Sequence, residues 1–106
     1  MRRVAKVDAN HRQIVVALEA VGCSVQSLHQ VGDGCPDLLV GHHGCNYLLE
    51  VKDGMKRPSA RRLTPDQVDW HGAWRGQKSV VENVEDAIAT VGVLGIIAVK
   101  QGRVGE

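Results

Sequence analysis

Hydrophobic residues recur at helical spacing in an early and a late segment of the chain. Residues 10–21 place apolar side chains on one face, and Gly22 follows, which predicts an amphipathic helix that ends there. Residues 84–91 repeat this pattern directly after Asn83, a residue type that caps helices. Two helices, one near each end of the chain, are therefore expected.

Capping residues mark the start of another helix between these two. Thr64 is a suitable N-cap, Pro65 suits the first helical position, and Gln67 completes the pattern of a capping box. We expect this helix to run over residues 65–75.

Apolar, β-prone runs separated by glycine-containing turns predict four strands, over residues 23–29, 37–40, 47–52 and 79–81. Residues 41–46 lie between the second and third strands, and we expect them to form a hairpin loop. The order is α-β-β-β-α-β-α, which predicts an α/β fold with a mixed sheet flanked by helices.

The length of 106 residues suits one domain, with a core over about residues 8–92 and a C-terminal segment over residues 93–106. No apolar run approaches the length of a membrane helix and no signal peptide is recognisable, so no membrane partner is expected. Three cysteines, an odd number, favour a reducing, cytoplasmic compartment. The net charge of +1 points to no partner by itself.

Positive charge is concentrated in a polar loop over residues 53–63. A basic loop beside a carboxylate site suits a polyanionic substrate. The alternative is that this run is solvated surface, as short charge runs often are. The loop residues expected to contact phosphates are Lys56, Arg57, Ser59, Arg61 and Arg62.

Two acidic residues and a lysine fall on neighbouring predicted strands. Asp37 lies near the start of one strand and Glu50 near the end of the next, so antiparallel pairing brings them together. Lys52 follows Glu50 by two residues and faces the same side of the strand. Two carboxylates can hold Mg²⁺ or Mn²⁺, and a lysine beside them can stabilise charge on a phosphate. The pattern predicts a metal-dependent phosphodiesterase site.

Three motifs together resemble the VRR-NUC family of the PD-(D/E)XK nuclease superfamily. They are Gly-Cys-Pro-Asp-Leu-Leu-Val over 34–40, Leu-Glu-Val-Lys-Asp-Gly over 49–54 and Leu-Thr-Pro-Asp-Gln over 63–67. The chain is most similar in pattern to the phage and bacterial stand-alone members, which are related to archaeal Holliday-junction resolvases. The resemblance implies a restriction-endonuclease-like fold.

The resemblance also implies a role for each matching residue. Asp37 and Glu50 are expected to coordinate the metal, together with the backbone carbonyl of Val51. Lys52 is expected to act on the attacking water or the phosphate, and Gln67 to reach the site from the head of its helix.

One position departs from the family pattern. The family usually places a Glu in the first turn of the first helix, and the corresponding residue here is Gln13. A neutral amide is a poor Mg²⁺ ligand, so Gln13 would support the metal site only weakly. Both glutamines have an alternative explanation as capping residues, Gln13 with Asn10 and Gln67 with Thr64.

The function expected from these residues is a Mg²⁺- or Mn²⁺-dependent DNA endonuclease. The resemblance further implies a homodimer that acts on branched DNA such as Holliday junctions. One alternative is a DNA-binding module of the same fold that has lost full metal ligation. Another is a small zinc-binding regulator, for which the candidate ligands Cys35, His42, His43 and Cys45 lack the usual spacing.

Overall fold

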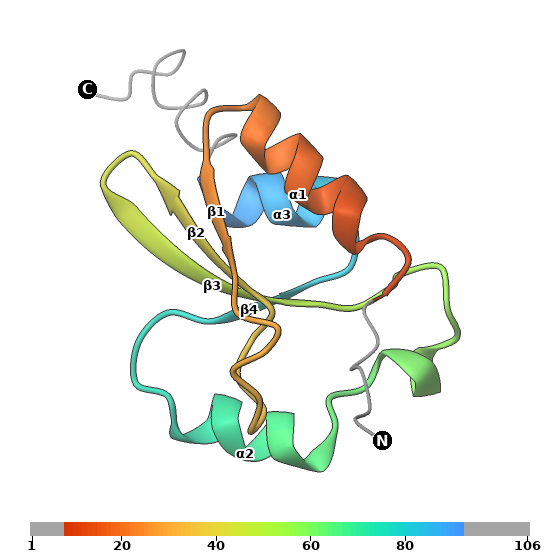
Figure 1. Ribbon diagram of the computed structural model, residues 1–106. Helices are drawn as coiled ribbons and strands as arrows, with labels where there is room; N and C mark the ends of the chain where they lie inside the picture. The colour runs from red at the N-terminus through yellow and green to blue at the C-terminus, as the bar shows by residue number, and fades with distance from the viewer. Residues whose placement is uncertain (1–7, 93–106) are drawn as a thin grey trace, which may run out of the picture.

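The computed structural model describes residues 8–92, which form four strands in one mixed sheet with helices on both faces (Figure 1). The predicted order α-β-β-β-α-β-α is confirmed, with one additional short 3₁₀ helix in the basic loop. The elements are α1 (His11–Ala20), β1 (Ser24–Ser27), β2 (Leu38–His42), β3 (Cys45–Val51), η1 (Pro58–Arg61), α2 (Pro65–Ala73), β4 (Ser79–Val81) and α3 (Val84–Thr90).

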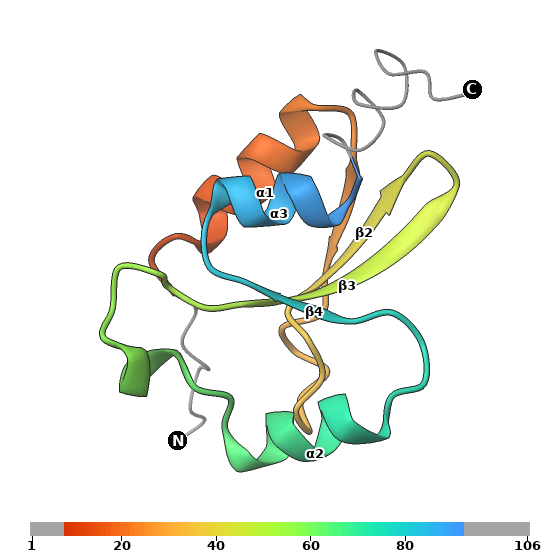
Figure 2. The same cartoon turned by 180° about the vertical axis from the view of Figure 1, so that it is seen from behind.

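The sheet has the strand order β1-β2-β3-β4. The first three strands are antiparallel neighbours, whereas β4 lies parallel to β3. A parallel neighbour requires a crossover connection, and the segment that carries η1 and α2 supplies it. Helices α1 and α3 lie together on one face of the sheet, and α2 lies on the other (Figures 1 and 2).

The hydrophobic core lies between the sheet and the pair α1 and α3. Alternation along each strand sends every second side chain into this layer, as with Leu49 and Val51 on β3. The intervening residue, Glu50, therefore faces α2. The buried core residues are Ile14, Leu18, Cys23, Leu38, Val40, Leu49, Val51, Val81, Ala87 and Val91.

The hairpin between β2 and β3 is tighter than the predicted six-residue loop. The strands continue to His42 and from Cys45, so only His43 and Gly44 remain in the turn. Both have positive φ, 51° and 78°, as a two-residue turn between twisted strands requires. The predicted hairpin is confirmed, but its loop is shorter than predicted because the glycine marks the turn itself, while the flanking residues extend the strands.

The remaining boundaries differ from the predictions by a few residues. The strand predicted over 23–29 is shortened to Ser24–Ser27, and the helix predicted over 65–75 ends at Ala73. The expected C-terminal segment, 93–106, lies outside the described residues. Within residues 8–92, no helix is long and apolar enough to span a bilayer.

Candidate active site

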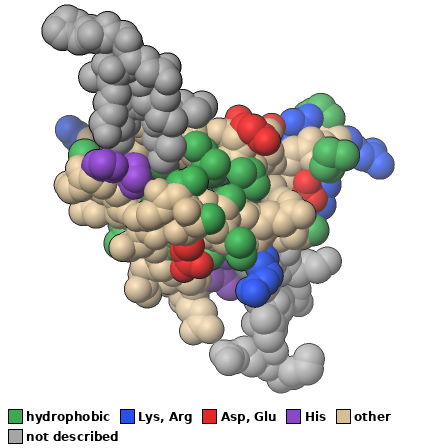
Figure 3. Space-filling view, turned by 90° about the horizontal axis from the view of Figure 1, so that it is seen from above, with side chains coloured by type: hydrophobic (Ala, Val, Ile, Leu, Met, Phe, Trp, Pro, Cys, Tyr) green, Lys and Arg blue, Asp and Glu red, His purple; other side chains and the backbone are tan. Residues whose placement is uncertain are grey.

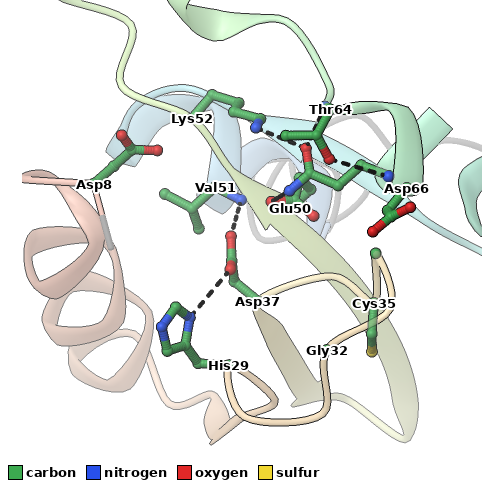
Figure 4. Close-up of a pocket in the computed structure, with 12 residues that line it drawn as sticks. Asp8, His29, Gly32, Cys35, Asp37, Glu50, Val51, Lys52, Thr64 and Asp66 are labelled. Atoms are coloured by element: carbon green, nitrogen blue, oxygen red, sulfur yellow. Dashed lines mark hydrogen bonds and ion pairs between the residues drawn. The ribbon is translucent and has the colours of Figure 1, made fainter. Parts of the chain in front are cut away.

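A pocket of about 250 Å³ lies where the end of β3, the turn before β2 and the start of α2 meet (Figure 4). Its lining includes all four residues predicted to act in catalysis, Asp37, Glu50, Lys52 and Gln67, and also Val51. The other lining residues are Asp8, His29, Gly32, Gly34, Cys35, Thr64 and Asp66.

Glu50 and Lys52 enter the pocket because of strand alternation. Their neighbours Leu49 and Val51 point into the core, so these two side chains project from the opposite face of the sheet. Only 1% of Glu50 and 8% of Lys52 is exposed. Burial of both charged groups is unusual outside paired arrangements, and it marks this part of the sheet as a specialised site.

Asp37 is fixed just before β2 by hydrogen bonds to its backbone and its side chain. The N–H of Val51 donates to Asp37 Oδ2 at 2.8 Å, and the N–H of Leu28 donates to the Asp37 carbonyl at 2.7 Å. His29 Nδ1 lies 3.8 Å from the other carboxylate oxygen, Oδ1 (Figure 4). The antiparallel pairing of β2 with β3 therefore brings Asp37 beside Glu50, as the sequence predicts.

Gln67 serves both of the roles that the sequence left as alternatives. Its side-chain Oε1 accepts from the Thr64 N–H at 2.9 Å, and its own N–H donates to Thr64 Oγ1 at 3.3 Å, which completes the capping box. The same Oε1 accepts from Lys52 Nζ at 2.8 Å, while Nε2 donates to Glu50 Oε2 at 3.1 Å. The cap therefore places the amide between the lysine and the glutamate.

The turn before β2 approaches the head of α2 closely at Gly34. Its φ of 81° is in the left-handed region, and a Cβ atom there would collide with the backbone carbonyl of Asp66. A glycine at this position lets the turn that leads to Asp37 pack against the helix that carries Gln67.

Negative charge is crowded at the centre of the pocket. Burial raises the pKa of Glu50 to about 8, and the adjacent Asp37 carboxylate contributes to the increase. Lys52 acts in the opposite direction but does not offset these effects. Either a proton on Glu50 or a bound cation would offset this penalty.

The residues present fit a magnesium-like ion. Glu50 Oε1 is buried and has no hydrogen-bond partner, although the other oxygen is engaged by Gln67. Mg²⁺ commonly uses one or two protein carboxylates and keeps several waters. Within residues 8–92, no three His, Cys, Asp or Glu side chains are grouped closely enough to hold a metal. A shell from Asp37 and Glu50 would therefore depend on water, backbone and substrate oxygens.

Gln13, which we expected at the metal site, lies elsewhere. It is exposed on α1 and does not line the pocket. Asn10 makes no side-chain cap for α1 and instead donates to the carbonyls of Lys52 at 3.1 Å and Glu82 at 2.9 Å. Asp8, which precedes this helix, lines the pocket instead of Gln13.

The basic loop contains paired and unpaired charges. Lys56 Nζ lies 3.0 Å from Asp8 Oδ1, and Arg61 forms an ion pair with Glu82 at 3.0 Å. Arg57, Ser59 and Arg62 are exposed. On the face shown in Figure 3, several Lys and Arg side chains lie toward the upper right with acidic side chains among them, and others lie apart at the left and at the bottom.

Asp8, His29 and His71 are among the residues near the site to which the sequence assigned no role. Asp8 and His29 line the pocket, and His71 Nε2 lies 3.9 Å from Glu50 Oε1 behind it. The spacing of four between Gln67 and His71 could have placed both on one helix face. Nothing local could have identified Asp8 or His29, because their positions depend on how the chain ends and turns pack.

The fold has a relative of known structure. The sequence matches no protein-family model and no curated protein. A solved structure described as a VRR_NUC domain superimposes with a TM-score of 0.57 and 26% identity, covering 79% of this chain and 96% of that one. The mixed four-stranded sheet with three helices is consistent with a restriction-endonuclease-like fold. This similarity supports the VRR-NUC family, to which the sequence motifs also point.

Proposed function

We propose that this protein is a nuclease that hydrolyses phosphodiester bonds in DNA with the help of Mg²⁺ or Mn²⁺. The observation that carries the proposal is the convergence of Asp37, Glu50, Lys52 and Gln67 in one pocket, where Gln67 hydrogen-bonds both Glu50 and Lys52. The likeness to a VRR_NUC domain supports the same reaction class.

Each residue has a separate part in this proposal. Asp37 and Glu50 would hold the metal, with the carbonyl of Val51 as a further ligand. When bound, the ion would lower the pKa of a water and neutralise charge on the phosphate. Lys52 places a positive charge where negative charge develops on the phosphoryl oxygens. Gln67 keeps Lys52 and Glu50 in a fixed relation through its two hydrogen bonds.

DNA would reach the pocket past the basic loop. Arg57 and Arg62 are exposed and can contact backbone phosphates, with Lys56, Ser59 and Arg61 beside them. Such contacts supply affinity without sequence information. The substrate class is therefore expected to be set by DNA shape, and branched DNA such as a Holliday junction is our proposal.

The central experiment measures cleavage of labelled duplex, flap, single-stranded and four-way-junction DNA with Mg²⁺, Mn²⁺ or EDTA. Asp37→Ala, Glu50→Ala and Lys52→Ala should each slow cleavage by at least about 10²-fold, because charge stabilisation at such sites has this size. Circular dichroism checks that each variant is folded. If all three cleave like the parent, the site assignment is wrong. Metal-independent binding without cleavage would indicate the DNA-binding module instead.

Two copies of the chain would suit a branched, two-fold symmetric substrate. A surface on α2 supports this extension, because Trp70 and Trp74 stack at 4.7 Å and Trp74 is 44% exposed. Beside Trp74 lies an apolar hollow lined also by Leu39 and Leu48. Sedimentation should show about 23 kDa, twice the 11.5 kDa chain. A monomer with and without junction DNA would exclude the resolvase proposal and leave a nuclease that acts on flaps or nicks.

A further inference from the structure

Helix α2 contacts the sheet through polar side chains. The only residue of this helix that is buried is His71, of which 9% is exposed, whereas Val68 is 54% exposed. A surface helix usually buries an apolar stripe instead. The attachment of α2 therefore depends on what His71 and its neighbours meet on the sheet.

Two side chains of α2 lie close to one carboxylate, that of Glu50. Gln67 and His71 are four residues apart, so they lie on the same face of the helix one turn from each other. Gln67 Nε2 donates to Glu50 Oε2 at 3.1 Å, and His71 Nε2 lies 3.9 Å from Glu50 Oε1. Each oxygen of Glu50 thus faces one nitrogen of α2.

The contact between His71 and Glu50 joins two unsatisfied atoms. His71 Nε2 and Glu50 Oε1 are both buried, and neither has a hydrogen-bond partner. Buried polar atoms without partners are uncommon in folded proteins. Their separation is too long for a hydrogen bond, but a closure of about 1 Å would make one. Catalytic hydrogen bonds commonly tighten in this way when a site is loaded.

We propose that His71 is a positioning residue that donates its Nε2–H to Glu50 Oε1 and, with Gln67 on Oε2, fixes the carboxylate for metal binding. This inference rests on the proposed function. A carboxylate that binds a metal needs hydrogen bonds from neighbouring groups to fix its orientation. Each carboxylate oxygen has a second lone pair, so a donor on each leaves room for the ion.

The direction of this contact follows from the chemistry of the two groups. An imidazole with a proton on Nε2 donates to a carboxylate oxygen whether the ring is neutral or charged. The contact is then a hydrogen bond from His71 to Glu50.

Both tryptophans of the chain report on this helix. Trp70 lies in α2 with its ring 5.6 Å from that of His71, and Trp74 is the C-cap. Intrinsic fluorescence therefore follows α2 while calorimetry follows the metal. Neither readout requires cleavage of DNA.

The experiment titrates Mg²⁺ into the parent and three variants at position 71. His71→Leu keeps an apolar volume but removes the donor, and should weaken Mg²⁺ binding about ten- to a hundredfold, the usual effect of losing such a partner. His71→Gln places an amide nitrogen near the position of Nε2 and should retain most of the affinity. His71→Asn is too short to reach Glu50 and should behave like His71→Leu. The Gln and Asn variants together give the test if His71→Leu does not fold.

A control distinguishes positioning from general support of the helix. Val68→Gly destabilises α2 at an exposed position that does not touch Glu50, so it should leave Mg²⁺ affinity unchanged even if it lowers the melting temperature. If it weakens binding as much as His71→Leu, or if the Gln and Asn variants bind alike, the positioning role is refuted while the nuclease proposal stands. If the parent itself binds neither Mg²⁺ nor Mn²⁺, the metal site and this inference fail together.

Discussion

Gln67 reaches from the first turn of α2 to Glu50 on β3, and its Nε2 donates to Glu50 Oε2 at 3.1 Å. The same side chain completes a capping box with Thr64. One residue therefore determines both where the helix begins and how the glutamate is held.

These two roles can be separated by comparing Gln67→Ala with Thr64→Ala. Both variants break the capping box and should lose about 0.5–2 kcal/mol of stability, the usual cost of removing a helix cap. Only Gln67→Ala also removes the hydrogen bonds to Glu50 and Lys52, so it should slow cleavage by a further factor of about ten or more, as expected when a partner of a metal ligand is lost. Thermal unfolding and cleavage rates are measured for both. Equal rates in the two variants would reduce Gln67 to a capping residue.

The raised pKa of Glu50 predicts a pH dependence of stability in EDTA. The folded protein holds a proton on Glu50 up to about pH 8, whereas the unfolded chain releases it near 4.5. The folded state therefore binds more protons between these values, and stability should fall as pH rises through this window. His71 has a lowered pKa and acts in the opposite direction below its ordinary value of 6.5. The effect of Glu50 should consequently be clearest between about pH 6.5 and 8.

Glu50→Gln provides the control for this pH dependence. The amide is nearly isosteric and does not titrate, so the melting temperature should fall less between pH 6.5 and 8 than it does in the parent. A parent and a variant with the same slope would show that Glu50 is not responsible. Saturating Mg²⁺ should raise the melting temperature of the parent at pH 8, since a ligand at about 100 times its Kd adds about 2.7 kcal/mol.

The placement of Asp37, Glu50 and Lys52 could be predicted because it follows from local rules. Strand alternation fixed the face for Glu50 and Lys52, and antiparallel pairing fixed the approach of Asp37. The order of elements was predictable for the same reason, since each helix and strand carries its own periodicity. The capping box of Gln67 was also visible in the sequence, but its reach to Glu50 depends on how α2 docks.

Positions that depend on long-range contacts could not be predicted. Asn10 resembles a helix cap, yet its side chain binds two carbonyls that lie 42 and 72 residues away along the chain. Asp8, two residues before Asn10, lines the pocket, whereas Gln13 is exposed. Similarly, His71 is buried only because its helix covers the face of the sheet that carries Glu50. No local pattern contains this information.

The basic loop predicts a specific change in the salt dependence of DNA binding. Arg57 and Arg62 are exposed, whereas Arg61 is engaged by Glu82. Replacing Arg57 and Arg62 together with Ala should weaken binding to all DNAs alike. It should also flatten the plot of log K against log salt by about two phosphate equivalents, because fewer counterions are released. Stability should change by less than about 0.5 kcal/mol, as is usual for exposed positions.

Arg12→Ala is the matched control for this loop. Arg12 is also exposed, but it lies on α1, outside the loop. Its replacement should leave the salt slope nearly unchanged. Fluorescence anisotropy at several salt concentrations measures all these slopes. If the double variant keeps the slope of the parent, the loop does not contact DNA. Its positive charges are then only solvated surface.

Substitutions at Asp8 and at Gln13 are expected to have different effects on metal binding. Asp8 lines the pocket and contributes to raising the pKa of Glu50, so its negative charge acts on the proposed metal site. Asp8→Asn removes that charge and should weaken Mg²⁺ binding by roughly tenfold, the order expected for one partly screened charge. Gln13→Glu adds a carboxylate at an exposed position outside the pocket, so its Mg²⁺ titration should match that of the parent.

The ion pair between Asp8 and Lys56 sharpens this comparison. Lys56 Nζ lies 3.0 Å from Asp8 Oδ1 and partly neutralises it, so Lys56→Met should tighten Mg²⁺ binding, provided that Asp8 is present. In the Asp8→Asn background the same change removes only the direct repulsion between Lys56 and the ion, so its effect should be smaller than in the parent, where it also frees Asp8. Calorimetric titration measures the Mg²⁺ affinity of the parent, the two single variants, the double variant and Gln13→Glu. If Gln13→Glu binds Mg²⁺ more tightly than the parent and Asp8→Asn binds it equally well, position 13 on α1 and not Asp8 acts on the metal site. That result would contradict the geometry of the pocket.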